Sequence, residues 1–254
     1  PLRAQEGRWH PELPESHGID FLAPLPALPA HLHSPWPSPP LVRPPDQVRA
    51  LYVNAWAFGG SRFRELIRLA DESEVNALVI DVKGDRGMIP YRSSVPLATE
   101  VGGQKIITVR DAEGLMALFK EKGVYTIARI VVFKDNLLAS ARPDLAVKTP
   151  TGEPWRDRES LAWVDPFRKE VWDYNIQIAV EAAKLGFDEI QFDYVRFPDS
   201  HSPRFSQPNT EEARVKASTG FLQEARSKLA PYNVFTAADI FGYVCWNLND
   251  TDIG

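Results

Sequence analysis

The run Phe187–Pro198 has the apolar and aromatic pattern of a strand buried on both faces, yet it contains Asp193 and Arg196. An ionised side chain in such a position destabilises the fold unless it is paired or has a function. Catalytic groups of α/β barrels lie near the C-terminal ends of buried parallel strands. The position of Asp193 therefore makes it the first candidate for a catalytic carboxylate.

Carboxylates are the side chains on which chemistry in this chain would depend. The five histidines are His10, His17, His31, His33 and His201, and four of them lie in an N-terminal segment that we expect to be unfolded. A Ser-His-Asp triad or a histidine-rich metal centre is therefore not expected. The single cysteine, Cys245, excludes an internal disulfide and a thiolate cluster for zinc or iron–sulfur. No cofactor is predicted.

Each expected strand carries a polar residue near its C-terminal end. These residues are Asn54, Asp81 with Lys83, Arg129, Asp193 and Asp239. In a barrel, the C-terminal ends of neighbouring strands meet around one mouth, so these side chains would converge there. A structural ion pair of Asp81 or Asp193 with Arg129 is the simpler explanation for any single one of them.

Glycoside hydrolysis needs two carboxylates that flank the scissile bond, one as acid and the other as nucleophile or base. We assign Asp193 as the nucleophile or base and Asp239 as the acid. Adjacent strands lie about 5 Å apart, which is compatible with the ~5–5.5 Å separation of a retaining pair. Arg129 and Arg196 would keep one aspartate ionised by lowering its pKa.

Tryptophans near these strand ends suit contact with sugars, because a pyranose ring has an apolar face. Trp155 and Trp163 lie in the long segment 134–165, and loops of this length in compact domains are usually functional or disordered. Trp56 follows the first strand, and packing against the protein is the alternative for each tryptophan. The expected substrate-binding residues are Asn54, Trp56, Asp81, Lys83, Arg129, Trp155, Trp163, Tyr194 and Arg196.

The elements that would position these residues alternate between strands and helices. The expected strands are 48–58, 77–82, 125–133, 189–197 and 234–243. The expected helices are 61–71 capped by Ser61, 111–123 capped by Asp111, 165–185 opened by Asp165 and Pro166 and closed by Gly186, and 210–229. This alternation is typical of a parallel sheet wrapped by helices.

An α/β barrel and an open doubly wound sheet both fit this alternation. No glycine-rich phosphate loop follows the first strand, because Phe58–Ser61 is too short for the G-x-G-x-x-G motif, and this disfavours a nucleotide-binding sheet. We therefore predict an α/β fold of the (β/α)8 or TIM barrel class. The sequence ends at Gly254, just after the fifth expected strand, so we expect a truncated barrel that needs three further βα units.

Composition divides the chain into two regions and excludes some partners. Residues 1–46 contain 12 of the 22 prolines and are expected to form an extended tail or linker, with the barrel domain in residues 47–254. A net charge of −5 gives no basic face for nucleic acid, and no apolar run is long enough to span a membrane. The oligomeric state is not predicted.

Several segments together resemble the DUF4015 family, a bacterial family described as glycosyl hydrolases. The segments are 186–198 (GFDEIQFDYVRFP), 128–135 (ARIVVFKD), 163–166 (WVDP), 237–242 (AADIFG) and, for the second strand, 76–83 (NALVIDVK). The resemblance covers about residue 48 to the C-terminus. It implies a barrel related to glycosidases, a carbohydrate substrate, an exported or cell-envelope location and a catalytic aspartate after the fourth strand, which is Asp193.

Two alternatives to a glycoside hydrolase remain at this point. The first is a carbohydrate-binding barrel that uses the same cleft without cleaving its ligand. The second is a barrel enzyme acting on a non-sugar substrate with a divalent cation at Asp81, Asp193 and Asp239, because carboxylate-only clusters suit magnesium or calcium.

Overall fold

The structure is a computed structural model that describes residues 44–60, 62–200 and 202–242. The predictions made for the Pro-rich segment up to residue 43, for Ser61, for His201 and for Cys245 lie outside the described residues. None of the helices in the described part is long and apolar enough to cross a membrane.

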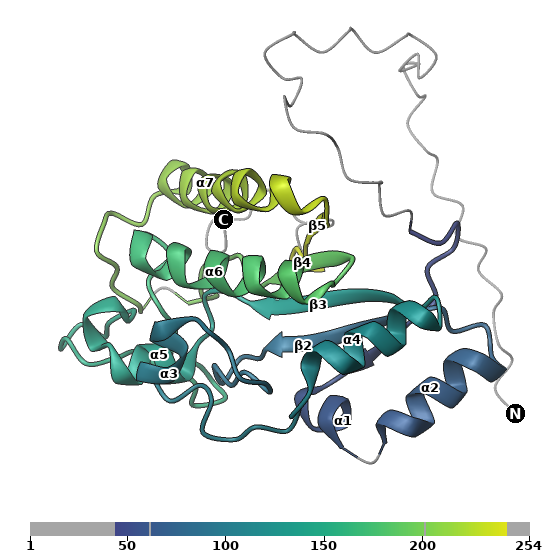
Figure 1. Ribbon diagram of the computed structural model, residues 1–254. Coiled ribbons are helices and arrows are strands. Elements are labelled where there is room, and N and C mark those ends of the chain that lie inside the picture. Colours follow the sequence, from purple (N-terminus) through teal and green to yellow (C-terminus); the bar gives the residue numbers. More distant parts are fainter. Residues whose placement is uncertain (1–43, 61, 201, 243–254) are drawn as a thin grey trace, which may run out of the picture. The chain divides into compact units, whose positions relative to one another are not determined.

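Within the described residues, five parallel strands form one sheet in which each strand pairs with the next along the chain. They are β1 (Ala50–Val53), β2 (Ala77–Lys83), β3 (Tyr125–Val131), β4 (Glu189–Asp193) and β5 (Phe235–Ala238). The predicted α/β fold with a parallel sheet is confirmed, and the sequential strand order is that of consecutive βα units. All five C-terminal ends therefore lie along the same edge of the sheet, and Figure 1 shows the arrowheads of β2 and β3 side by side there.

Seven α-helices and two short 3₁₀ segments connect the described strands. They are α1 (Ala55–Gly59), α2 (Phe63–Glu72), α3 (Pro96–Glu100), α4 (Ala112–Glu121), α5 (Asn136–Ala141), η2 (Pro143–Leu145), α6 (Lys169–Leu185), α7 (Glu211–Leu229) and η3 (Ala230–Tyr232). The expected cap at Asp111 is confirmed, since its side chain accepts a hydrogen bond from a backbone N–H in the first turn, and Thr210 caps α7 in the same way. Gly186 ends α6 with a positive φ of 100°, as expected for a helix C-terminus.

Several predicted boundaries were wrong. The first strand ends at Val53, because Asn54 accepts hydrogen bonds from two backbone N–H groups and caps α1. Helix α6 begins at Lys169 and not at Asp165, whose carboxylate instead accepts from the backbone of Phe167 and Ser206. The segment 134–165 is also more ordered than expected, since it contains α5 and η2.

The two faces of the sheet have different surroundings. Side chains of one face pack into the core shared with the helices: Leu78, Ile80, Val82, Ala128, Ile130, Ile190 and Phe192. The alternate side chains form the other face, where Ala77, Val79, Tyr125 and Ile127 make a small second cluster. Asp81, Arg129 and Asp193 follow it toward the C-terminal edge. The prediction that β4 is buried on both faces was therefore wrong, because its burial alternates.

A register shift between Asp81 and Lys83 removes Lys83 from the polar face. Strict alternation would put the two side chains on one face, but Lys83 pairs with Ile130, a core residue. Its ammonium is fully buried, lies 2.7 Å from Asp135 and stands 5.8 Å from the centre of the Tyr174 ring. Lys83 has no exposed side-chain surface, so it cannot make the predicted contact with a substrate.

We predict that Lys83→Met destabilises the protein by about 3–5 kcal/mol, because it leaves the buried Asp135 carboxylate without its cation. Urea denaturation at neutral pH measures this change. The matched control is Lys122→Met, which breaks the exposed ion pair of Lys122 with Asp71 and should leave the midpoint nearly unchanged. Equal midpoints for the two variants would contradict the structural role of Lys83.

Candidate active site

An arginine on β3 joins two aspartates on the neighbouring strands. Arg129 Nη1 lies 2.6 Å from Asp81 Oδ1, and Arg129 Nε lies 2.9 Å from Asp193 Oδ2, which also accepts from Nη2. The Tyr52 hydroxyl on β1 donates to Asp81 Oδ2, and its ring lies 5.7 Å from the guanidinium carbon of Arg129. Four adjacent strands thus bring one polar side chain each to a single cluster.

Mutual stabilisation of opposite charges sets the electrostatics of this cluster. Burial alone would lower the pKa of Arg129, but its hydrogen bonds and its charge interactions with Asp81 and Asp193 outweigh that effect and raise the pKa. Burial, together with the hydrogen bond to Asp81 and the charge of Asp81, raises the pKa of Tyr52 to about 12. The ion pairing expected as the simple explanation is therefore present, and one arginine serves both carboxylates.

The backbone is left-handed just after Asp193, and a backbone N–H there holds the carboxylate. Asp193 Oδ1 accepts a hydrogen bond of 2.6 Å from the backbone N–H of Tyr194, whose φ is +52°. A positive φ is uncommon outside glycine, so the surrounding structure must hold it. The backbone of Val132 donates to the Asp193 carbonyl at 2.8 Å. The Asp193 side chain is about one-fifth exposed, so it faces the open side of the sheet while pinned by Arg129.

Asp239 follows β5 and lies next to the end of β4. Its backbone N–H donates to the Phe192 carbonyl at 2.9 Å, and its Oδ1 accepts a 2.6 Å hydrogen bond from Gln191 Nε2. Burial raises the pKa of Asp239, and the charge of Asp193 raises it further, while the hydrogen bond from Gln191 acts in the opposite direction. The two carboxylates therefore differ, since Asp193 is held by an arginine and Asp239 is biased toward its protonated form.

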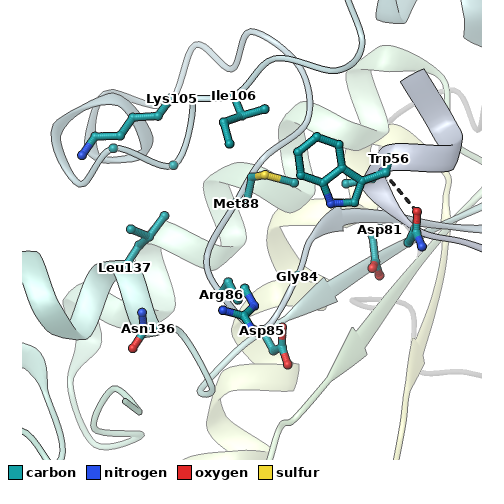
Figure 2. Close-up of a pocket in the computed structure, with 14 residues that line it drawn as sticks. Trp56, Asp81, Gly84, Asp85, Arg86, Met88, Lys105, Ile106, Asn136 and Leu137 are labelled. Carbon is teal, nitrogen blue, oxygen red and sulfur yellow. Dashed lines mark hydrogen bonds between the residues drawn. The ribbon is translucent and has the colours of Figure 1, made fainter. Parts of the chain in front are cut away.

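A first pocket, the β2 pocket, lies beside Asp81 and has a volume of about 510 Å³. It is lined by Asn54, Ala55, Trp56, Asp81, Gly84, Asp85, Arg86, Met88, Gly102, Gly103, Lys105, Ile106, Asn136 and Leu137. Figure 2 shows the Trp56 indole projecting from α1 into this pocket, and 59% of the residue is exposed. Trp56 is therefore not a core residue, whereas the Asn54 side-chain oxygen is occupied by capping α1.

A second pocket, the β4 pocket, has a volume of about 480 Å³. It is lined by Lys134, Trp155, Arg156, Asp157, Arg158, Glu159, Trp163, Tyr194, Arg196, Pro198, Asp199, Ser200 and Ser202. Trp163 is only 3% exposed and donates from its indole to Asp157, so it anchors the loop and offers little surface. Trp155 is less buried and donates to Ser202. The structure thus separates the expected residues into two pockets, with Arg129 and Asp193 in the cluster described above.

Sequence reasoning missed three parts of this site. Tyr52 lies before the residue that was predicted to end the first strand. Apart from strand alternation, nothing in the sequence indicates its hydrogen bond to Asp81. Gln191 precedes Asp193 by two residues on the same face, which alternation within β4 could have indicated. Lys134 lies 3.2 Å from Asp157 and 2.8 Å from Glu159, partners 23 and 25 residues away in a loop.

The arrangement also bears on the predicted alternative of a divalent cation. Within the described ranges, no group of three histidine, cysteine, aspartate or glutamate side chains could hold a metal ion. The guanidinium of Arg129 already lies between Asp81 and Asp193 and supplies their positive charge. Two of the three expected metal ligands, Asp81 and Asp193, are thus already paired with the arginine.

Comparison with known proteins places the chain among glycosidase-like folds. The model of the DUF4015 family, described as "Putative glycosyl hydrolase domain", matches residues 50–254, as the motifs predicted. A hypothetical protein from Ruminiclostridium thermocellum ATCC 27405 is 38% identical with a TM-score of 0.67, over 76% of this chain and 98% of that one. No curated protein matches this sequence.

Two solved glycosidases share the fold at low identity. The GH20 exo beta-N-acetylglucosaminidase of Vibrio harveyi, an inactive D437A mutant, gives a TM-score of 0.53 at 14% identity, over 75% of this chain and 35% of that one. The maltogenic alpha-amylase AmyB of Thermotoga neapolitana gives a TM-score of 0.51 at 15% identity, over 78% of this chain and 47% of that one. The chain thus spans less than half of either enzyme, and the likeness concerns the fold.

We predict that Arg129→Met lowers the free energy of unfolding by about 3 kcal/mol at pH 7, because it leaves Asp81 and Asp193 as two partly buried charges without a cation. Urea denaturation at neutral pH measures it, and Arg129→Lys should lose less because it keeps the charge. Equal losses for Arg129→Met and Arg129→Lys would contradict this electrostatic role.

Proposed function

The chain belongs to the DUF4015 family, and from that membership we propose that it is a glycoside hydrolase acting on a polysaccharide or cell-envelope glycan. The observation that carries the proposal is a pair of unlike carboxylates at one edge of the sheet. Asp193 is bound by Arg129, whereas the pKa of Asp239 is raised by burial and by the charge of Asp193. Glycosidic cleavage requires such a division between an ionised and a protonated carboxyl group.

Asp239 acts as the general acid in this proposal. Its proton passes to the oxygen of the leaving sugar as the bond between the anomeric carbon and that oxygen breaks. Burial favours the neutral form of Asp239, so the proton is available at a pH above the ordinary aspartate range.

Asp193 supplies the electrons for the anomeric carbon. It either bonds to that carbon directly, as in retaining enzymes, or removes a proton from a water that attacks the carbon, as in inverting enzymes. Arg129 orients the Asp193 carboxylate and faces it with a positive charge through its Nε and Nη2 groups. The five described strands then form part of a (β/α)8 barrel, with the reacting groups at the C-terminal ends of β4 and β5.

Sugar units on either side of the scissile bond would occupy the two pockets. Trp56 offers an exposed indole in the β2 pocket, which also contains apolar side chains from Met88, Ile106 and Leu137. Trp155 and Tyr194 provide aromatic surface in the β4 pocket. Aromatic surface suits the apolar face of a pyranose ring, which supports these roles.

We predict different losses for the two catalytic carboxylates. Asp193→Asn should lower kcat/KM at least ~10³-fold on every substrate, because no other group replaces its charge. Asp239→Asn should lose comparable activity on natural glycans but retain much of it on nitrophenyl glycosides, whose leaving group needs no proton. Steady-state kinetics on a glycan panel and on matched nitrophenyl glycosides measure both. Asp173→Asn, on the exposed side of α6, is the control.

The pH profile provides a separate prediction. Activity needs protonated Asp239, so kcat/KM should fall as pH rises through the raised pKa of Asp239. In Asp239→Asn, the residual activity on nitrophenyl glycosides should lose this alkaline decline. A decline that persists in the variant would assign the acid to another residue.

A carbohydrate-binding barrel without hydrolysis is the second candidate function. It is favoured by the full engagement of Asp193, whose two oxygens accept from Arg129 and from the Tyr194 backbone. This candidate predicts glycan binding that survives Asp193→Asn and no release of reducing ends by the unaltered protein. Reducing-end release that Asp193→Asn abolishes would exclude it.

A further inference from the structure

The β4 pocket contains more positive charge than its own carboxylates neutralise. Four cations line it, Lys134, Arg156, Arg158 and Arg196, against three carboxylates, Asp157, Glu159 and Asp199. Two of these carboxylates, Asp157 and Glu159, are already paired with Lys134. The lining therefore carries one net positive charge, and its third carboxylate, Asp199, is exposed.

Arg196 is the most deeply placed of these arginines. Its guanidinium carbon lies 5.4 Å from the Trp163 ring centre, 5.0 Å from Tyr194 and 4.9 Å from Phe241. It donates to the Phe197 carbonyl at 3.2 Å, and it forms no ion pair with any carboxylate of the described residues. Burial lowers the pKa of Arg196, since nearby charges, including Tyr194 and Asp193, only partly offset the loss of water.

Arg156 and Arg158 add charge without internal partners of opposite sign. Arg156 Nη1 donates to two neutral acceptors, Asn136 Oδ1 and the Ser160 carbonyl, each at 2.9 Å. Neither arginine forms an ion pair within the part of the chain that the structure describes, and both are exposed. Their guanidinium groups are therefore available to a ligand.

We infer that the β4 pocket recognises an anionic oxygen group, such as a carboxylate, carried by a sugar of the substrate. A guanidinium has a planar fork of donors that matches a carboxylate or phosphate, and aromatic rings can cover its faces while its edge still donates. The aromatic rings around Arg196 hold the guanidinium in this way, and Trp155 adds a surface for the sugar ring.

The β4 pocket lies close in the chain to Asp193, the proposed nucleophile or base. Tyr194 follows Asp193 directly in the chain and Arg196 comes two residues later, so the charged sugar would lie near the nucleophile or base. The sugar part of the ligand and its place beside the reacting groups rest on the proposed function. The substrate class is therefore an acidic glycan, with its charged unit adjacent to the scissile bond.

Paired ligands that differ only in charge test the inference. Oligosaccharides of glucuronic, galacturonic and mannuronic acid are each compared with their carboxyl-reduced neutral forms by isothermal titration calorimetry, using the whole chain. At least one acidic member should bind about tenfold more tightly than its reduced partner, since a hydrogen bond to a charged group is worth that much. Inorganic phosphate should compete with the acidic oligosaccharide and leave the neutral one unaffected.

Variants then assign the effect to the pocket. Arg196→Gln should abolish the preference for the acidic member, and Arg158→Gln, at an exposed position that leaves the fold intact, should reduce it about threefold. Arg64→Gln, at an exposed arginine on α2, is the control and should keep it. The inference is overturned if none of the acidic oligosaccharides binds more tightly than its reduced form, or if none binds at all. It is also overturned if the preference for the acidic member survives both pocket variants.

Hydrolysis is scored separately in the same experiments. Cleavage of neutral glycans without any preference for acidic ones would overturn this inference and leave the proposed hydrolase standing. A preference for acidic oligosaccharides without cleavage would overturn the proposed hydrolase and support the pocket assigned here.

Discussion

The ion pairs that Arg129 makes with Asp81 and Asp193 are the interaction on which the rest of the site depends. They place a cation between carboxylates from β2 and β4 and so hold the ends of three strands in a fixed arrangement. Without this cation, two partly buried negative charges would face one another in a poorly solvated place. Tyr52 extends the same network to β1 through its hydroxyl. A single guanidinium thus contributes to local stability and orients the proposed nucleophile.

The pKa of Asp239 also depends on the charges of Asp193 and Arg129. Burial is the main cause of the rise in its pKa and the charge of Asp193 adds to it, while the hydrogen bond from Gln191 and the charge of Arg129 act in the opposite direction. Neither aspartate would have its role if placed alone at the end of a strand. The structure therefore produces an unequal carboxylate pair from two identical side chains, through the placement of one arginine and the burial of one partner.

Much of this organisation could be predicted from the sequence because it depends on short-range patterns. Strand and helix periodicity located the sheet, the cap at Asp111, and the polar residues at the strand ends. Lys83 could not be placed correctly, because a register shift in β2 turns it toward the helices, and alternation carries no sign of that shift. Tyr52, Gln191 and Lys134 were missed because their partners are chosen by strand pairing and loop folding. The extent of the first strand was misjudged because Asn54 acts through its side chain as a helix cap.

We propose that Asp193 and Asp239 form an electrostatically coupled, unequal pair. A carbon-13 NMR titration of the aspartate carboxyl groups, with Asp239 assigned from its asparagine variant, measures this coupling. We expect Asp239 to titrate above the ordinary aspartate pKa of about 3.9, and Asp193→Asn to lower this pKa by removing the neighbouring negative charge. An Asp239 titration at or below the ordinary value, or one unchanged by Asp193→Asn, would contradict it.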